Sequence, residues 1–167
     1  MKKEKVLLIS NFLDNTGYSV AGQGLALALN TIPNIDLICR VLKLNDNKDY
    51  SDVPPEIFNL INKDSSDCSI CIQHSLPHLC EPNYRFKKNI IYFAWETNNF
   101  IDSGWFLHLN LFDEIWVINP DQKDACLKSG VKKPIYVFPH AFDPEKYQNL
   151  DSLPPLDLPV NKDSFLF

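Results

Sequence analysis

Residues Lys5–Ser10 have the sequence KVLLIS, and a polar segment, Asn11–Gly17, and a helix-like apolar stripe follow them directly. A continuous apolar run of this length is typical of a strand that is buried on both faces of a sheet. The stripe repeats at the spacing of one helix face, at Val20, Ala21, Gly24, Leu25, Ala28, Leu29 and Ile32. Ser19 is predicted to cap this helix and Pro33 to end it. A strand, a loop and a helix in this order predict the first unit of a parallel α/β sheet.

The alternation of apolar runs and helix signals continues along the chain. Five further strands are predicted, at Asp36–Leu44, Cys68–Gln73, Asn89–Trp95, Glu114–Ile118 and Pro134–Phe138. Further helices are predicted at Pro54–Asn62, at Asp102–Leu111 and from Pro120 onward, the last with Asn119 as its cap and Gly130 after its final turn. The pattern predicts an α/β fold with a doubly wound, mostly parallel, Rossmann-like sheet and helices on both faces.

The expected strand order is 3-2-1-4-5-6, which right-handed crossovers favour in doubly wound sheets. This order opens a crevice between the first and fourth strands, outside their carboxyl ends. Two segments then flank the crevice, residues 11–19 after the first strand and residues 96–99 after the fourth. We therefore expect Gly17 and Glu96 to lie near each other.

The charge balance is 16 basic against 21 acidic residues, a net charge of −5. Because broad binding to nucleic-acid phosphates needs a basic face, we expect no nucleic-acid partner. The longest uncharged stretch, Gly17–Ile35, is too polar for a membrane span, and the apolar run Val6–Ile9 is too short for a signal peptide. The sequence thus predicts a cytoplasmic protein with five reduced cysteines, in which residues 1–147 form one domain.

The glycines after the first strand suggest an anion site. Gly17, Gly22 and Gly24 are spaced G-x4-G-x-G, which matches neither the dinucleotide fingerprint nor the P-loop. Backbone amides at the start of a helix attract anions, phosphate above all, so Gly17, Tyr18 and Ser19 are candidates to bind substrate. The alternative is that these glycines let the helix pack close to the sheet. Both interpretations stay open at Gly17, and packing is favoured at Gly24.

Two titratable side chains follow the later strands. Glu96 lies at the end of an aromatic strand, where a carboxylate acts as a base or binds sugar hydroxyls. His140, after the sixth strand, is a candidate acid or base. For both residues the alternative is a hydrogen bond that anchors a loop. The three tryptophans are predicted to be core residues, at Trp95, Trp105 and Trp116.

A run of metal-binding residue types follows the pattern C-x2-C-x2-H-x3-H-x-C, at Cys68, Cys71, His74, His78 and Cys80. Zinc accepts such ligands. However, the first part of the run is predicted to be a strand, on which Cys68 and Cys71 point to opposite faces, and no glycine is present to form a knuckle. We therefore predict no metal site.

Four segments carry a resemblance to a known family. GYSVAGQGL at Gly17–Leu25 resembles the first loop and helix of nucleotide-sugar glycosyltransferases with the GT-B fold, of the family-4 type. NIIYFAWET at Asn89–Thr97 resembles a strand end in a bacterial subgroup of these enzymes. FDEIWVINP at Phe112–Pro120 and GVKKPIYVFPHAFD at Gly130–Asp143 are similar to two later family segments. The four segments occur in the family's order and span most of residues 5–147.

The resemblance implies a two-domain enzyme that moves a hexose from a nucleotide-sugar donor to an acceptor hydroxyl of a polysaccharide, glycolipid or similar molecule. This chain corresponds to the acceptor-side amino-terminal domain. By the resemblance, residues 148–167 would correspond to a Pro-rich linker and the start of a donor-binding domain that is expected to be missing here. The family's Glu-x7-Glu donor motif needs two glutamates eight apart, and the glutamates at 4, 56, 81, 96, 114 and 145 include no such pair. This chain alone is therefore expected to be inactive.

The resemblance also implies site roles. Glu96 and His140 would be catalytic, and the substrate-binding residues would be Gly17, Tyr18, Ser19, Thr97, Asn98 and Asn119. Many relatives have His where this chain has Trp95-Glu96, and Ser where it has Asn119. No metal or other cofactor is expected. The expected partners are a nucleotide sugar, a glycan or lipid-linked acceptor and the missing domain, with peripheral membrane association allowed. The alternatives are a non-catalytic nucleotide- or sugar-binding Rossmann-like module, or another GT-B enzyme such as an epimerase or phosphorylase.

Overall fold

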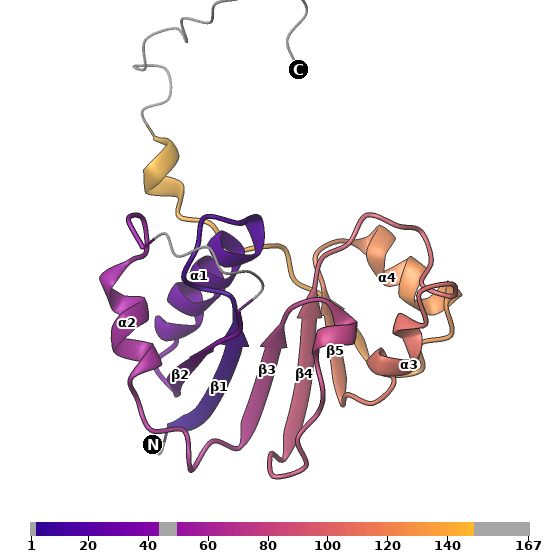
Figure 1. Cartoon of the computed structure of the whole chain (residues 1–167), viewed down its shortest axis with the longest axis horizontal. Coiled ribbons are helices and arrows are strands. Elements are labelled where there is room, and N and C mark those ends of the chain that lie inside the picture. The colour runs from indigo at the N-terminus through magenta and orange to yellow at the C-terminus, as the bar shows by residue number, and fades with distance from the viewer. Residues whose placement is uncertain (1–2, 44–49, 149–167) are drawn as a thin grey trace, which may run out of the picture.

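The computed structural model describes residues 3–43 and 50–148, in which strands and helices alternate around one sheet (Figure 1). The strands are β1 (Glu4–Ser10), β2 (Ile35–Val41), β3 (Ile70–His74), β4 (Lys88–Phe93), β5 (Glu114–Val117) and β6 (Ile135–Val137). The α-helices are α1 (Gly17–Asn30), α2 (Pro55–Ile61), α3 (Trp105–Leu109) and α4 (Pro120–Lys128), and two 3-10 turns are η1 (Pro77–Leu79) and η2 (Pro144–Tyr147). All neighbouring strands are parallel, which confirms the predicted Rossmann-like α/β class. The predicted linker, apart from Gln148, lies outside the described residues.

The strand order is β2-β1-β3-β4-β5-β6, so the predicted order 3-2-1-4-5-6 is wrong. β3 lies between β1 and β4 instead of at the edge of the sheet. The reason is the connection from β3 to β4, residues 75–87, which contains only the short turn η1. A parallel connection needs a dozen or more residues and usually an α-helix even to reach a neighbouring strand, so this one cannot pass over two others. The reversal of winding direction therefore falls between β1 and β3.

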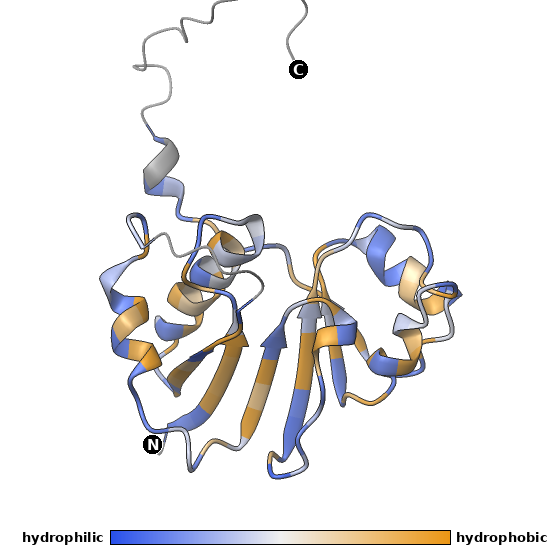
Figure 2. Ribbon diagram, in the orientation of Figure 1, coloured by the Kyte–Doolittle hydropathy of each residue, from blue (hydrophilic) through white to orange (hydrophobic). Residues whose placement is uncertain are grey.

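The two helix pairs cover opposite faces of the sheet in its two halves (Figure 1). α1 and α2 contribute to one buried cluster with β1 and β2, at Val6, Leu8, Ala26, Leu37, Cys39, Ile57 and Leu60. α3 and α4 contribute to another with β4, β5 and β6, at Ile91, Phe93, Trp105, Leu109, Ile115, Val117, Ala125, Cys126 and Ile135. Along β4 the clusters alternate, since Ile90 and Tyr92 belong to the first and Ile91 and Phe93 to the second. In Figure 2 the strands show hydrophobic colour interrupted by hydrophilic segments, one of them at the carboxyl end of β3.

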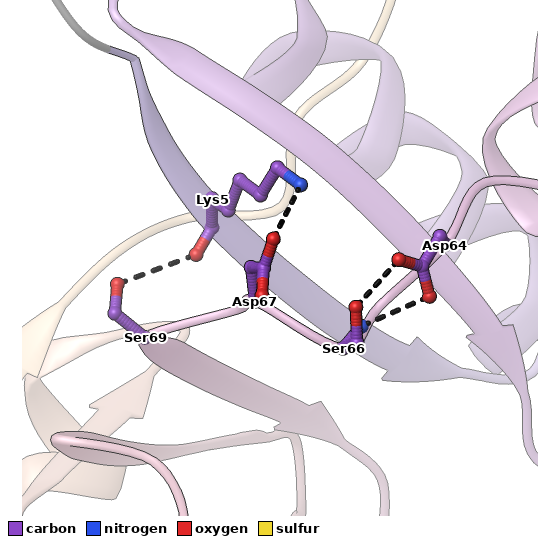
Figure 3. Close-up of polar contacts among 5 residues, drawn as sticks. All are labelled: Lys5, Asp64, Ser66, Asp67 and Ser69. Carbon is purple, nitrogen blue, oxygen red and sulfur yellow. Dashed lines mark hydrogen bonds and ion pairs between the residues drawn. The ribbon is translucent and has the colours of Figure 1, made fainter.

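The remaining face of β1 and β3 is covered by connecting segments rather than by a helix. Cys68, just before β3, and Phe86, just before β4, form a small buried cluster there with Leu7, Ile38 and Cys71. The segment that enters β3 is held to β1 by polar contacts (Figure 3): Lys5 Nζ lies 3.6 Å from Asp67 Oδ2, and Ser69 Oγ donates to the Lys5 carbonyl at 3.4 Å. These contacts start β3 beside β1, in agreement with the observed strand order.

Local signals at the helix ends are mostly confirmed. Asn119 caps α4, because its side chain accepts a hydrogen bond from the Gln122 amide at 2.8 Å. The cap of α1 is Thr16, not Ser19, because Thr16 Oγ1 accepts from the Ser19 amide at 3.3 Å and α1 begins at Gly17. Within residues 3–43 and 50–148, no helix is both long and apolar enough to cross a bilayer.

Close packing explains two glycines of α1. A Cβ atom at Gly22 would lie 2.4 Å from Ser10 Oγ, and one at Gly24 would lie 2.5 Å from the Ala141 carbonyl oxygen. A Cβ atom at Gly17 would meet nothing within 4 Å. The packing interpretation is therefore confirmed at Gly22 and Gly24, and Gly17 faces open space.

Candidate functional site

The carboxyl edge of the sheet carries an open cavity of about 490 Å³, here called the Gly17 cavity. Its lining comes from the start of α1, the end of β3, the segment after β4 and the segment after β6. The residues are Thr16, Gly17, Tyr18, Ala21, His74, Ala94, Trp95, Glu96 and His140. The predicted closeness of Gly17 and Glu96 is thus confirmed, although β3 lies between the strands they follow.

Tyr18 explains how the loop after β1 meets the end of β4. Its hydroxyl donates to the Ala94 carbonyl at 2.8 Å and accepts from the Ala94 amide at 3.3 Å. The side chain thereby reaches past the end of β3. Burial is the main cause that raises the pKa of Tyr18 to about 12, so the hydroxyl stays protonated and keeps its role as a donor.

The loop before α1 is shaped by the buried carboxylate of Asp14. It accepts from the Thr16 amide at 2.9 Å, from Thr16 Oγ1 at 2.6 Å and from Asn11 Nδ2 at 2.7 Å. These bonds place Thr16 as the cap and direct the start of α1 toward the cavity. The structure does not bring Ser19 into that space, because its buried hydroxyl accepts from the Asp14 amide and its own amide is occupied by Thr16. Gly17 and Tyr18 are therefore the residues at the start of α1 whose backbone amides stay available to a ligand in the cavity.

His74 is a cavity residue that sequence reasoning missed as a binding group. It ends β3, is fully buried, and its Nδ1 lies 2.9 Å from Ser10 Oγ. Its Nε2 has no hydrogen-bond partner among the described residues. Burial, with a smaller contribution from His140, lowers the pKa of His74 to about 3, so the ring is neutral near pH 7. In the sequence His74 stood out only as part of the cysteine and histidine run, and the predicted strand order put β3 at the sheet edge, away from the crevice.

His140 stands beside His74 on the segment after β6. The two rings meet edge-on with centroids 6.0 Å apart, and the ring of Tyr92 lies 5.7 Å from that of His140. Tyr92 also donates a hydrogen bond to the Phe138 carbonyl at 2.9 Å, which ties the end of β6 to β4. Partial burial lowers the pKa of His140. Glu96, on the facing segment, is exposed to solvent.

The core prediction holds for Trp105 and fails for Trp95. Trp105 is 8% exposed, whereas Trp95 is 37% exposed, because it follows the end of β4 instead of lying within it. The Trp95 ring packs edge-on against Trp105 at 5.0 Å. Trp116 is half-buried and packs against the α1–α2 side of the sheet. Trp95 is therefore a surface aromatic anchored on the core.

A second cavity, of about 430 Å³, adjoins the first and is here called the Asn119 cavity. The segment 94–96 lines both cavities, and Trp95 also lines a third, smaller hollow of about 270 Å³. Thr97, Asn98 and Asn119 all lie in the Asn119 cavity. The predicted site residues, apart from Ser19, are thus divided between two adjacent cavities on the same edge of the sheet.

The cysteine and histidine run is built into the core. β3 begins at Ile70, so Cys68 precedes the strand and joins the same buried cluster as Cys71; the prediction that they point to opposite faces is wrong. Burial raises the pKa of Cys71 and of Cys80 to about 12, and the ring of His78 stacks on Trp105 at 5.4 Å. In the part of the chain that the structure describes, no group of three or more His, Cys, Asp or Glu side chains could hold a metal ion.

The fold and the cavities together define a Rossmann-like, all-parallel α/β domain with a candidate site at the carboxyl edge of its sheet. Comparison with protein families finds no matching family model, and comparisons with curated proteins and with solved structures find no significant match. The glycosyltransferase interpretation accordingly depends on the sequence motifs and on the geometry of the site.

Proposed function

We propose that this chain is the acceptor-side domain of a GT-B-type glycosyltransferase, which moves a sugar from a nucleotide-sugar donor to an acceptor hydroxyl. The observation that carries the proposal is the composition of the Gly17 cavity. It combines the amino end of a 14-residue helix with a carboxylate, Glu96, and two histidines, His74 and His140. α1 has no acidic residue in its first turn to offset its dipole.

These groups suit the two ends of the reaction. Transfer of a sugar develops positive charge on the sugar and negative charge on the leaving diphosphate. The amides of Gly17 and Tyr18, which form no hydrogen bond within the described residues, would stabilise the diphosphate. Glu96 and His140 would contact the acceptor hydroxyl or the transferred sugar, with proton transfer as their role. Residues of the Asn119 cavity would extend the acceptor site.

Binding to residues 1–167 tests the proposal directly. Uniformly ¹⁵N-labelled protein would be titrated with UDP- and GDP-sugars and with methyl glycosides of glucose, galactose, mannose and N-acetylglucosamine. We expect shifts of the Gly17 and Tyr18 amides and of the Trp95 indole. If no such compound perturbs any residue of the Gly17 cavity, the proposal is wrong.

Turnover separates this proposal from the alternative of a non-catalytic module. We expect residues 1–167 to transfer no sugar and a longer protein that contains the donor domain to do so. Nucleotide binding without transfer by any longer protein would support the module instead. Robust transfer by residues 1–167 alone would contradict the two-domain interpretation.

A further inference from the structure

We propose that Nε2 of His74 is a specificity contact of the Gly17 cavity, which forms a hydrogen bond with a hydroxyl group of the bound sugar. The inference depends on the proposed function, because it names a residue that recognises the ligand of the same cavity. It comes from a buried ring nitrogen that has no hydrogen-bond partner among the described residues. Nearly all buried polar groups in proteins have a hydrogen-bond partner, and an unpaired one calls for an explanation.

The two nitrogens of the His74 ring differ in their hydrogen bonding. Nδ1 is paired with Ser10 Oγ at 2.9 Å, and Nε2 is buried with no partner among the described residues. Ser10 does not line the Gly17 cavity, whereas His74 does. The Nδ1 edge therefore points away from the cavity, and the ring has its unpaired nitrogen left for a ligand.

The surroundings hold the ring in one orientation. It packs against Tyr18 and Tyr92, with centroids 5.2 and 5.0 Å away and shallow interplanar angles of 34° and 31°. Tyr18 is itself fixed to Ala94, and Tyr92 to Phe138. The third ring in contact, that of His140, belongs to an exposed residue. Since Nε2 is buried, the proposal requires a side chain to move when a ligand binds, and the exposed His140 side chain is the candidate.

The chemistry of this edge favours a hydroxyl over an anion. His74 is neutral, so it offers a single donor or a single acceptor and no positive charge. A hydroxyl both donates and accepts, so it pairs with either tautomer of the ring. A site with a buried polar group of this kind rejects a ligand that lacks the matching hydroxyl, which is how a sugar pocket gains specificity.

Nuclear magnetic resonance of the ring nitrogens tests the contact in the wild-type protein. Residues 1–167 would be titrated with the same four methyl glycosides, and the ¹⁵N shifts of His74 recorded. We expect the glycoside that binds to shift Nε2 and to leave Nδ1, still paired with Ser10, nearly unchanged. Shifts of Tyr18 and Trp95 without a shift of Nε2 would overturn this inference alone. The absence of any shift in the cavity would overturn the proposed function and this inference with it.

Two variants provide a matched pair. In His74→Gln the side-chain amide reaches the position of Nε2, whereas in His74→Asn it reaches only that of Nδ1 and keeps the bond to Ser10. We expect His74→Asn to weaken glycoside binding by about tenfold and His74→Gln by less than about threefold, in line with the loss of one neutral hydrogen bond. Equal affinities of the two variants, or weaker binding by Gln than by Asn, would assign His74 a purely structural role.

Discussion

Ser10 and His74 are partners in the last pair of residues between β1 and β3, and their side chains are hydrogen-bonded, with Oγ 2.9 Å from Nδ1. The pair lies where the winding of the sheet reverses. From β1 the chain continues to β2 on one side, and from β3 it continues to β4 on the other. Ligands of open α/β sheets bind outside the carboxyl ends of the strands at such a reversal. The bond therefore joins the two strands at the base of the Gly17 cavity.

The first prediction concerns Gly22, the glycine of α1 that packs against Ser10. Gly22→Ala should lower the free energy of unfolding by about 1–3 kcal/mol, because the new methyl group would overlap Ser10 Oγ and the Asn11 carbonyl. Gly17→Ala is the matched control. The Cβ atom added at Gly17 meets nothing within 4 Å, so this variant should be as stable as wild type or more stable by up to about 1 kcal/mol. Urea unfolding measures both, and equal stabilities of the two variants would contradict the packing of α1 described above.

The second prediction is a pH dependence of stability caused by His74. Its pKa is lowered from 6.5 to about 3 in the folded state, so between these values the unfolded chain binds more protons. Stability should therefore fall as pH decreases below about 6.5, by up to about 1.4 kcal/mol per pH unit from this residue. His74→Gln should show a shallower decrease between pH 6.5 and 4.5, measured by urea unfolding. His108→Gln, which removes a histidine outside the cavities, is the control, and parallel curves for wild type and His74→Gln would refute the prediction.

The third prediction separates binding from folding at Glu96. The side chain is exposed, so Glu96→Gln should leave the unfolding curve unchanged. It should weaken glycoside binding by about tenfold or more, because hydrogen bonds to a charged acceptor contribute about 1.5–3 kcal/mol. Glu81→Gln removes the same charge from an exposed residue that lines none of the three cavities. Glycoside titrations of the two variants should differ, and equal affinities would remove Glu96 from the site.

The fourth prediction concerns the five cysteines, all of which are buried as free thiols. Burial raises their pKa values, so the thiolate needed for zinc binding or rapid oxidation is disfavoured. Elemental analysis should find well under one zinc per chain, and a thiol reagent should react slowly until the protein is unfolded. One zinc per chain, lost in Cys71→Ser, would refute the prediction.

The fifth prediction tests the cap of α4. Asn119→Ala should lower the free energy of unfolding by about 1 kcal/mol, because the Gln122 amide loses its acceptor. Asn119→Asp keeps an acceptor at that position and adds a charge that the helix dipole favours, so it should retain wild-type stability. Thermal or urea unfolding of both variants checks the difference. If Asp is as destabilising as Ala, the cap does not stabilise the helix in the way the geometry indicates.

Local sequence was sufficient for the elements of the fold. Apolar runs such as Lys5–Ser10 and Asn89–Trp95 became buried strands within one to two residues of their predicted limits, because burial on both faces leaves few alternatives for such runs. The cap at Asn119 was also predictable, since its partner is only three residues away. The grouping of Gly17 with Glu96 followed from the parallel arrangement, because all carboxyl ends of a parallel sheet lie at one edge.

Only the tertiary structure decided which strands are neighbours, and with that the composition of the site. The sequence of β3 is compatible with an edge or an interior position, and its place depends on the length of its connections and on packing against β1 and β4. The roles of His74 and Trp95 followed from that placement. His74 became a buried residue of the cavity with one ring nitrogen unpaired, and Trp95 became an exposed residue of the cavity lining. Exposure and unsatisfied hydrogen bonds are properties of the surroundings of a side chain, and those surroundings come from residues far away in the sequence.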